Sequence, residues 1–296
     1  MDVELLIRQI INGLNTGSIY ALVAVGYTMV YGIIKLINFA HGEIMMFGAY
    51  FAFIFATSLP INLPFIVIVV FAMALAALMG IVTEKLAYKK LRTAPRISAL
   101  ITAIGVSLFL QNLALLIFEP KPKVMPALIS KEPVDIFGID VPLVTIYTIV
   151  ISIMMMLVLT YFVQKTKPGR AMRAVSQDKE AAMLMGINVD RIISLTFAIG
   201  SALGALGGIF YSIAFTQVYP TLGVMPGLKA FIAAVFGGIG NIFGAMIGGY
   251  TIGFIEAMTK GYISSQWSDA IVFGILILVL LFKPSGLLGK NVKEKV

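Results

Sequence analysis

Residues 62–84 have the sequence NLPFIVIVVFAMALAALMGIVTE and carry no charged side chain before Glu84. An α-helix needs about 20 consecutive apolar residues to cross a bilayer, so this stretch predicts a membrane-spanning helix. Similar charge-poor stretches occur on both sides of it, at 17–34, 43–59, 97–118, 142–163, 191–213, 240–259 and 268–282. Segment 3–16 either extends the first helix or lies at the membrane interface. A shorter segment rich in glycine and alanine, 224–239, is either a half-helix or a further crossing. We therefore expect one all-α transmembrane domain over residues 1–296, a polytopic helical bundle of about eight or nine passes, one of them short or broken.

The composition agrees with a membrane protein and excludes several classes of enzyme. Of the 296 residues 59% are hydrophobic and 12% charged, whereas soluble domains have about 45–50% apolar and about 25% charged residues. Cysteine is absent and His41 is the single histidine, which excludes disulfides, thiol chemistry and histidine clusters. The segment most similar to an ATP-binding P-loop, 286–291, has the wrong spacing and the wrong last residue. We expect no catalytic residue, no metal site and no cofactor in this chain.

Lysine and arginine gather in some loops and are scarce in others. Loops 85–96 and 164–191 and the C-terminal tail are basic, whereas 119–141 has three lysines against four acids and 214–222 has no charge. The positive-inside rule places the basic segments and the C-terminus in the cytoplasm. The same rule explains the net charge of +8 without a nucleic-acid partner.

Glycines recur at every fourth position in two places. They are Gly200, Gly204 and Gly208, and Gly240, Gly244 and Gly248. Small residues at this spacing let helices approach closely in lipid, so we interpret both sets as helix-packing ridges rather than as substrate contacts.

The basic loop at about 164–190 has the pattern of two short helices joined by a turn. Pro168 and Gly169 end the preceding span, Asp178 is a plausible N-cap with Glu180 in the first turn, and Gly186 is a plausible residue after the helix end. Such helices either lie on the lipid surface or bind a partner protein, and the residues alone favour the partner slightly.

Several polar residues fall within apolar surroundings. Asn38, His41, Gly42 and Glu43 lie in a very short connection between two spans, which is either an ordinary loop or a broken helix lining a pathway. Glu256 lies inside a span, where an ionisable residue suggests function or pairs with a polar partner on another helix. Segment 217–229 contains two prolines and two glycines, and it is a gate, a docking surface or a turn.

Two segments carry a specific resemblance. Residues 26–50, GYTMVYGIIKLINFAHGEIMMFGAY, and 169–187, with Gly-Arg-Ala-Met-Arg-Ala followed by Glu-Ala-Ala and Met-Gly-Ile, are similar in register to LivH-type permease subunits of ABC importers for branched-chain amino acids. Segment 237–250 resembles the glycine-rich stretch of the same family, and the resemblance runs through nearly the whole chain. Sugar permeases share the loop pattern but not Asn-Phe-Ala-His-Gly-Glu.

The resemblance implies a set of partners. Such a subunit pairs with a second permease (a sister chain or another copy), two cytoplasmic ATPases that bind ATP and magnesium, and an external substrate-binding protein, in the cytoplasmic membrane of a bacterium or archaeon. Its loop supplies the coupling helices, and the residues implied in contact with the ATPases are Gly169, Arg170, Arg173, Asp178, Glu180, Ala181, Ala182 and Gly186. Ala181, Ala182 and Gly186 matter there because larger side chains cannot seat. The resemblance also places Asn38, His41 and Glu43 near the translocation path or its gate.

Other functions are compatible with parts of the sequence. Permeases of urea and short-amide importers are similar, so the substrate is not fixed by the chain. An ion-coupled secondary transporter needs acidic residues within spans, for which Glu43 and Glu256 are the candidates. A membrane-embedded enzyme would need a nucleophile motif or a pair of intramembrane aspartates. The sequence has neither, so we set this function aside.

Overall fold

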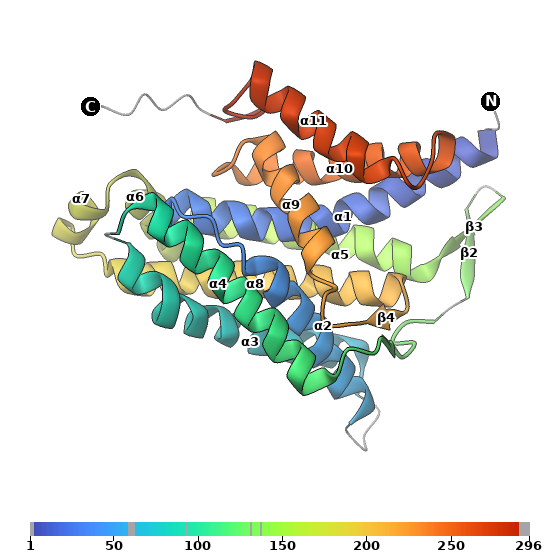
Figure 1. The fold of residues 1–296 in the computed structure, drawn as a ribbon, viewed down its shortest axis with the longest axis horizontal. Coiled ribbons are helices and arrows are strands. Elements are labelled where there is room, and N and C mark those ends of the chain that lie inside the picture. Colours follow the sequence, from blue (N-terminus) through green and yellow to red (C-terminus); the bar gives the residue numbers. More distant parts are fainter. Residues whose placement is uncertain (1–2, 59–62, 93, 131, 137, 290–296) are drawn as a thin grey trace.

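The computed structural model describes residues 3–58, 63–92, 94–130, 132–136 and 138–289 (Figure 1). The described residues form eleven α-helices and four short strands. The helices are α1 (Val3–Ile34), α2 (His41–Thr57), α3 (Phe65–Thr83), α4 (Arg96–Phe118), α5 (Leu143–Lys165), α6 (Lys167–Gln177), α7 (Lys179–Leu184), α8 (Val189–Ala214), α9 (Val224–Gly237), α10 (Ile242–Tyr262) and α11 (Ser268–Phe282). The strands are β1 (Lys123–Val124), β2 (Pro133–Ile136), β3 (Ile139–Pro142) and β4 (Gln217–Val218).

The helices form a bundle with two distinct ends. In Figure 1 the short helices α6 and α7 lie at the left end and the β2–β3 hairpin lies at the right end. We call these the α6–α7 end and the hairpin end. The strands pair as two antiparallel sheets, β1 with β4 and β2 with β3. The sequence analysis did not foresee either sheet.

Helix α1 is the core of the bundle. It contacts α5, α8, α9 and α10, and every residue from Gly17 to Val30 is buried. Its packing on α10 brings the two backbones together, because a Cβ atom added at Gly17 would lie 2.8 Å from Tyr250 Cα. Close approach through small residues stabilises helix pairs in lipid, where apolar burial alone gives no driving force.

The peripheral helices present large apolar side chains outward. Leu116 on α4, Leu157 on α5 and Leu281 on α11 are 83%, 62% and 72% exposed. A belt of exposed leucine and isoleucine suits hydrocarbon, so this surface supports a membrane protein.

The described helices agree with the expected spans, but the number of passes is not established. Six helices among the described residues, α1, α3, α4, α5, α8 and α10, are long and apolar enough to cross a membrane. Helices α2, α9 and α11 have 17, 14 and 15 residues. The count of eight or nine passes therefore stays a prediction.

Candidate functional site

The α6–α7 segment has the predicted form of two short helices joined at a cap. Thr166 caps α6 by accepting the Gly169 amide at 3.1 Å, and Asp178 caps α7 by accepting the amides of Glu180 and Ala181 at 2.9 and 3.0 Å. Gly186 follows α7 with φ +79°, a backbone conformation that favours glycine. The predictions of Asp178 as the cap of α7 and of Gly186 as the residue after the helix end are confirmed, whereas the Thr166 cap was not predicted.

Helix α6 is anchored to the bundle. Met172 and Val175 are buried, and α6 contacts α1, α5 and α8. A Cβ atom added at Gly169 would lie 2.5 Å from the Val163 carbonyl oxygen, so the tight connection between α5 and α6 requires a glycine there. Helix α6 is therefore held directly against three long helices of the bundle.

Helix α7 presents an apolar surface that differs from the expected one. Ala182 is 3% exposed, because its side chain faces the rest of this chain, whereas Leu184 and Met185 are 89% and 82% exposed. A larger side chain at Ala182 would thus disturb the packing of the loop itself. Six other residues were expected to contact a partner, and all of them are exposed: Arg170, Arg173, Asp178, Glu180, Ala181 and Gly186. The sequence analysis did not single out Leu184, because α7 is too short for its hydrophobic spacing to show which residues face outward.

A network of ion pairs lies beside this segment and joins the end of α3 to the start of α8. Asp190 pairs with Lys89 at 2.8 Å and with Arg92 at 2.5 Å, and Arg92 also pairs with Glu84. The second Glu84 oxygen accepts the Ser194 hydroxyl at 2.8 Å. Shared charges of this kind fix the relative position of two helices, and only the fold reveals them.

The connection between α1 and α2 is a re-entry into the bundle rather than a surface loop. The chain leaves α1 at Lys35, which has φ +58°, and α2 begins at His41. A Cβ atom added at Gly26 would lie 2.5 Å from His41 Nε2. Gly26 precedes the end of α1 by eight residues, or about 12 Å at 1.5 Å per residue. Helix α2 therefore begins well inside the bundle, as a broken helix does.

The polar residues of this connection are buried, and several of their atoms lack a partner. Asn38, His41 and Glu43 are 2%, 1% and 3% exposed. Asn38 Oδ1 accepts the Tyr88 hydroxyl at 2.8 Å, and Glu43 Oε1 accepts the Ser107 hydroxyl at 3.2 Å. Within the described part of the chain, His41 Nε2, Asn38 Nδ2 and Glu43 Oε2 have no hydrogen-bond partner.

Helices α2 and α9 meet at their N-termini. A Cβ atom added at Gly42 would lie 2.6 Å from the Gly223 carbonyl oxygen, and one added at Gly227 would lie 2.8 Å from Gly42 Cα. The two first turns are thus in backbone contact. Segment 217–229, which the sequence left as a gate, a docking surface or a turn, contains β4 and the start of α9.

Glu256 belongs to a buried charge cluster. Lys229 Nζ lies 3.0 Å from Glu256 Oε1 and 2.7 Å from Asp269 Oδ1, Lys260 Nζ lies 2.5 Å from Glu256 Oε1, and the Tyr20 hydroxyl donates to Glu256 Oε2 at 2.8 Å. Two carboxylates thus face two ammonium groups. Because Glu256 is already neutralised, it is a poor site for a coupling cation, which weakens the ion-coupled interpretation. The alternative of a polar partner for Glu256 agrees with this geometry, and the sequence did not reveal Lys229 as that partner.

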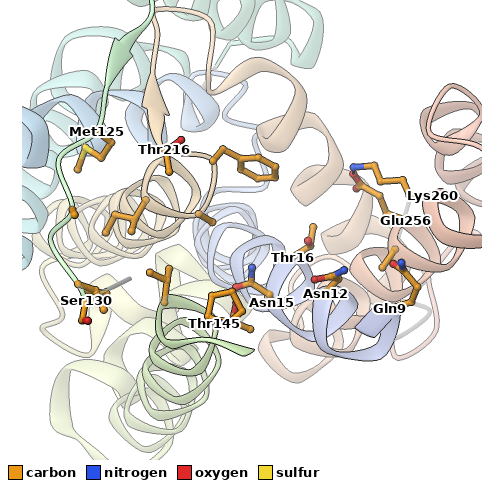
Figure 2. Close-up of a pocket in the computed structure, with 18 of the residues that line it drawn as sticks. Gln9, Asn12, Asn15, Thr16, Met125, Ser130, Thr145, Thr216, Glu256 and Lys260 are labelled. Atoms are coloured by element: carbon orange, nitrogen blue, oxygen red, sulfur yellow. The ribbon is translucent and has the colours of Figure 1, made fainter. Parts of the chain in front are cut away.

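A cavity of about 590 Å³, lined by both polar and apolar residues, opens beside this cluster (Figure 2). One face of α1 contributes Gln9, Asn12 and Thr16, and the ends of α8 and α10, the start of α5 and residues 125–130 complete the wall. Its place in the first half of α1 puts the cavity toward the hairpin end. Within the described residues no three histidine, aspartate or glutamate side chains gather to ligate a metal ion.

The glycines spaced four residues apart lie at contacts between helices, with one exception. A Cβ atom added at Gly200 would lie 3.1 Å from the Gly26 carbonyl oxygen, and one added at Gly204 would lie 3.1 Å from His41 Nε2. Gly208 approaches Met45, and Gly244 and Gly248 approach Gly237 and Ala233 of α9. Gly240 is not part of a helical ridge: it lies in the turn before α10 with φ +95°, because α9 ends at Gly237 and Asn241 caps α10.

The fold defines a class: a polytopic helical membrane protein in which the short helices α2 and α9 meet at their N-termini and a two-helix segment is anchored at one end. Residues 9–281 match the family described as the permease component of branched-chain amino acid transport systems, and the chain belongs to this family.

Individual relatives cover almost the full length. The chain is 42% identical to the high-affinity branched-chain amino acid transport system permease protein BraD of Pseudomonas aeruginosa, over 98% of both chains. It is 41% identical to the corresponding protein LivH of Escherichia coli K12, over 98% of this chain and 97% of the relative. The ribose import permease protein RbsC of Haemophilus influenzae is 27% identical over 92% of this chain and 84% of its own. No solved structure matches the chain.

Proposed function

We propose that this chain is the permease subunit of an ATP-driven importer for branched-chain amino acids. The observation that carries the substrate class is the identity of 41–42%, across nearly the whole chain, to permeases named for branched-chain amino acids. The function of an ATP-driven subunit further requires a surface that receives motion from an ATPase, and the exposed tip of α7 supplies one.

The α6–α7 segment, within the loop at about 164–190, transmits that motion. Leu184 and Met185 insert into a groove of a cytoplasmic ATPase subunit, and the exposed Arg170 and Glu180 set the orientation through charges at the rim. Because α6 packs on α1, α5 and α8, a shift of α7 moves these helices as a body. ATP and magnesium bind to the partner ATPases, not to this chain.

The distribution of lysine and arginine among the loops indicates which end of the bundle faces the cytoplasm. The α6–α7 end, with the basic loops and the C-terminus, faces the cytoplasm, and the hairpin end faces outward. Helices α2, α9 and α11 also cross the membrane, which gives one transmembrane domain of nine passes in a cytoplasmic membrane, with α9 the shortest pass. The external binding protein delivers substrate to the hairpin end, near the cavity of Figure 2.

The pathway follows α2 and α9. A second permease subunit, a sister chain or another copy, faces this one, and the spans reorient to open one side of the membrane at a time. Asn38, His41, Gly42 and Glu43 lie along or beside this pathway.

Leu184→Glu tests the proposal. The complete importer, with both permeases, two ATPases and the binding protein, is reconstituted in vesicles, and uptake of labelled leucine and ATP hydrolysis are measured. We expect Leu184→Glu to abolish co-purification of the ATPases and uptake, because a carboxylate replaces an apolar contact, while the chain inserts at normal abundance. Leu116→Glu is not a suitable control because Leu116 faces lipid. Lys90→Gln is the matched control: Lys90 is exposed in the basic loop 85–96, outside the α6–α7 segment, and the change lowers the charge by the same single unit as Leu184→Glu. Full uptake by Leu184→Glu would refute the coupling role.

A further inference from the structure

A second cavity, of about 200 Å³, lies where α2, α4 and α9 meet, apart from the cavity of Figure 2. Its wall includes Gly42 and Glu43 of α2, Ser107 and Leu108 of α4, and Gly227 and Phe231 of α9. Pockets for drug-sized ligands span about 300–1,000 Å³, so this smaller volume suits a molecule of the size of one amino acid.

One side of the cavity carries an incompletely bonded carboxylate. Glu43 is 3% exposed, and its Oε1 accepts the Ser107 hydroxyl at 3.2 Å. Its Oε2 has no hydrogen-bond partner among the described residues. A buried carboxylate oxygen in this state calls for a donor, and a charged ammonium group is the strongest one.

The same side receives the positive ends of two helices. Neither Ala40 before α2 nor Gly223 before α9 caps its helix through a side chain, and the two first turns touch at Gly42 and Gly223. The amides of His41 and Val224 already donate to the carbonyl oxygens of Asn38 and Thr221, and Pro226 has no amide hydrogen. The dipoles of the two helices, rather than a set of free amides, therefore favour an anionic group at this position. A cationic and an anionic group of one ligand are therefore both accommodated near Gly42.

The opposite side is apolar. Ile104 and Leu108 of α4 and Leu228 and Phe231 of α9 form it. A branched aliphatic side chain finds apolar contacts there and no fixed charge.

We infer that this cavity is the transient binding site of the amino acid during its passage through the permease. Glu43 binds the α-ammonium group, the positive N-terminal ends of α2 and α9 favour the carboxylate, and the α4–α9 wall contacts the branched side chain. The inference rests on the proposed function and names the substrate contacts that the proposed function leaves open.

The complete importer in vesicles provides the test, with two readouts. The first is ATP-dependent uptake of leucine by Glu43→Gln, which keeps the shape of the side chain and removes its charge. A charge-assisted hydrogen bond contributes enough that we expect uptake to fall at least about tenfold. Ser107→Ala, which frees Glu43 Oε1, lowers uptake by a smaller factor. Gly105→Ala, two residues away on α4 with open space around the added methyl group, is the matched control and leaves uptake unchanged.

The second readout is photo-crosslinking with photo-leucine, whose diazirine sits on the side chain. We expect ATP- and binding-protein-dependent labelling of Leu108, Leu228 or Phe231 in the parent importer, suppressed by excess leucine, but not by 4-methylpentanoate, which lacks the ammonium group. Glu43→Gln abolishes this labelling. Labelling confined to the wall of the larger cavity, or uptake and labelling by Glu43→Gln equal to the parent, would overturn the site while leaving the importer function standing. A parent importer that takes up no leucine would instead overturn the proposed function.

Discussion

Replacement of Lys229 by methionine removes one member of the buried charge cluster and keeps the volume of the side chain. The side chains of Lys229 and Glu256 are 7% and 4% exposed, and their charged atoms lie 3.0 Å apart. Removal of one partner of such a buried pair costs about 3–5 kcal/mol. Glu256 retains Lys260 and Tyr20, and Asp269 is 48% exposed and therefore hydrated, so we expect a loss at or below the lower limit of this range, about 2–3 kcal/mol.

Thermal unfolding of the purified chain in detergent measures this loss. At about 2–3 °C per kcal/mol for a chain of this size, Lys229→Met should lower the Tm by about 4–8 °C. Lys260→Met is the matched control: its side chain is 44% exposed and its pair with Glu256 spans one helical turn, so it should cost at most about 1 kcal/mol.

A double-mutant cycle separates pairing from packing. Lys229→Met combined with Glu256→Gln should be more stable than the sum of the single effects by about 1 kcal/mol or more, because the remaining group is no longer a buried unpaired charge. Additive losses, or a Lys229→Met protein as stable as Lys260→Met, would refute the account of the cluster.

The remaining predictions concern helix caps and close packing. Asp178→Ala removes the cap of α7 and should cost about 1 kcal/mol of local stability, which faster trypsin cleavage after Lys179 with an unchanged Tm of the whole chain would show. Asp178→Asn keeps the accepting oxygen and should restore protection. Equal cleavage rates in the parent and both variants would contradict the cap. Gly26→Val places carbon atoms where His41 Nε2 lies only 2.5 Å from an added Cβ, so it should lower the Tm by several degrees or abolish folding. Gly105→Val, with open space around the added atoms, should be tolerated. Equal Tm values for the two variants would show that α1 and α2 are not in close contact at Gly26.

Local signals in the sequence were sufficient for the long helices and for α7, but not for the two short sheets. The charge-free stretches located the long helices to within a few residues, except that α1 begins at Val3 because 3–16 continues the first span. The pattern of Asp178, Glu180 and Gly186 predicted the α7 cap and its end, because capping depends on residues three or four positions apart.

Contacts between distant residues could not be predicted in this way. The approach of Gly42 to Gly223 and the pairing of Lys229 with Glu256 and Asp269 depend on how helices pack, which no local pattern encodes. The same is true of the inward face of Ala182, since α7 is too short for its hydrophobic spacing to define a face. Gly240 lies in a turn although its spacing from Gly244 is helical, because Asn241 begins a new helix.

The most direct test of the account is the composition of the native complex. The chain is tagged, extracted gently from its membrane and purified, and every co-purifying protein is identified. The account predicts two P-loop ATPases and a second permease chain or copy, and leucine uptake into vesicles that requires ATP and the binding protein. A folded chain that purifies alone and takes up leucine down an ion gradient would contradict it.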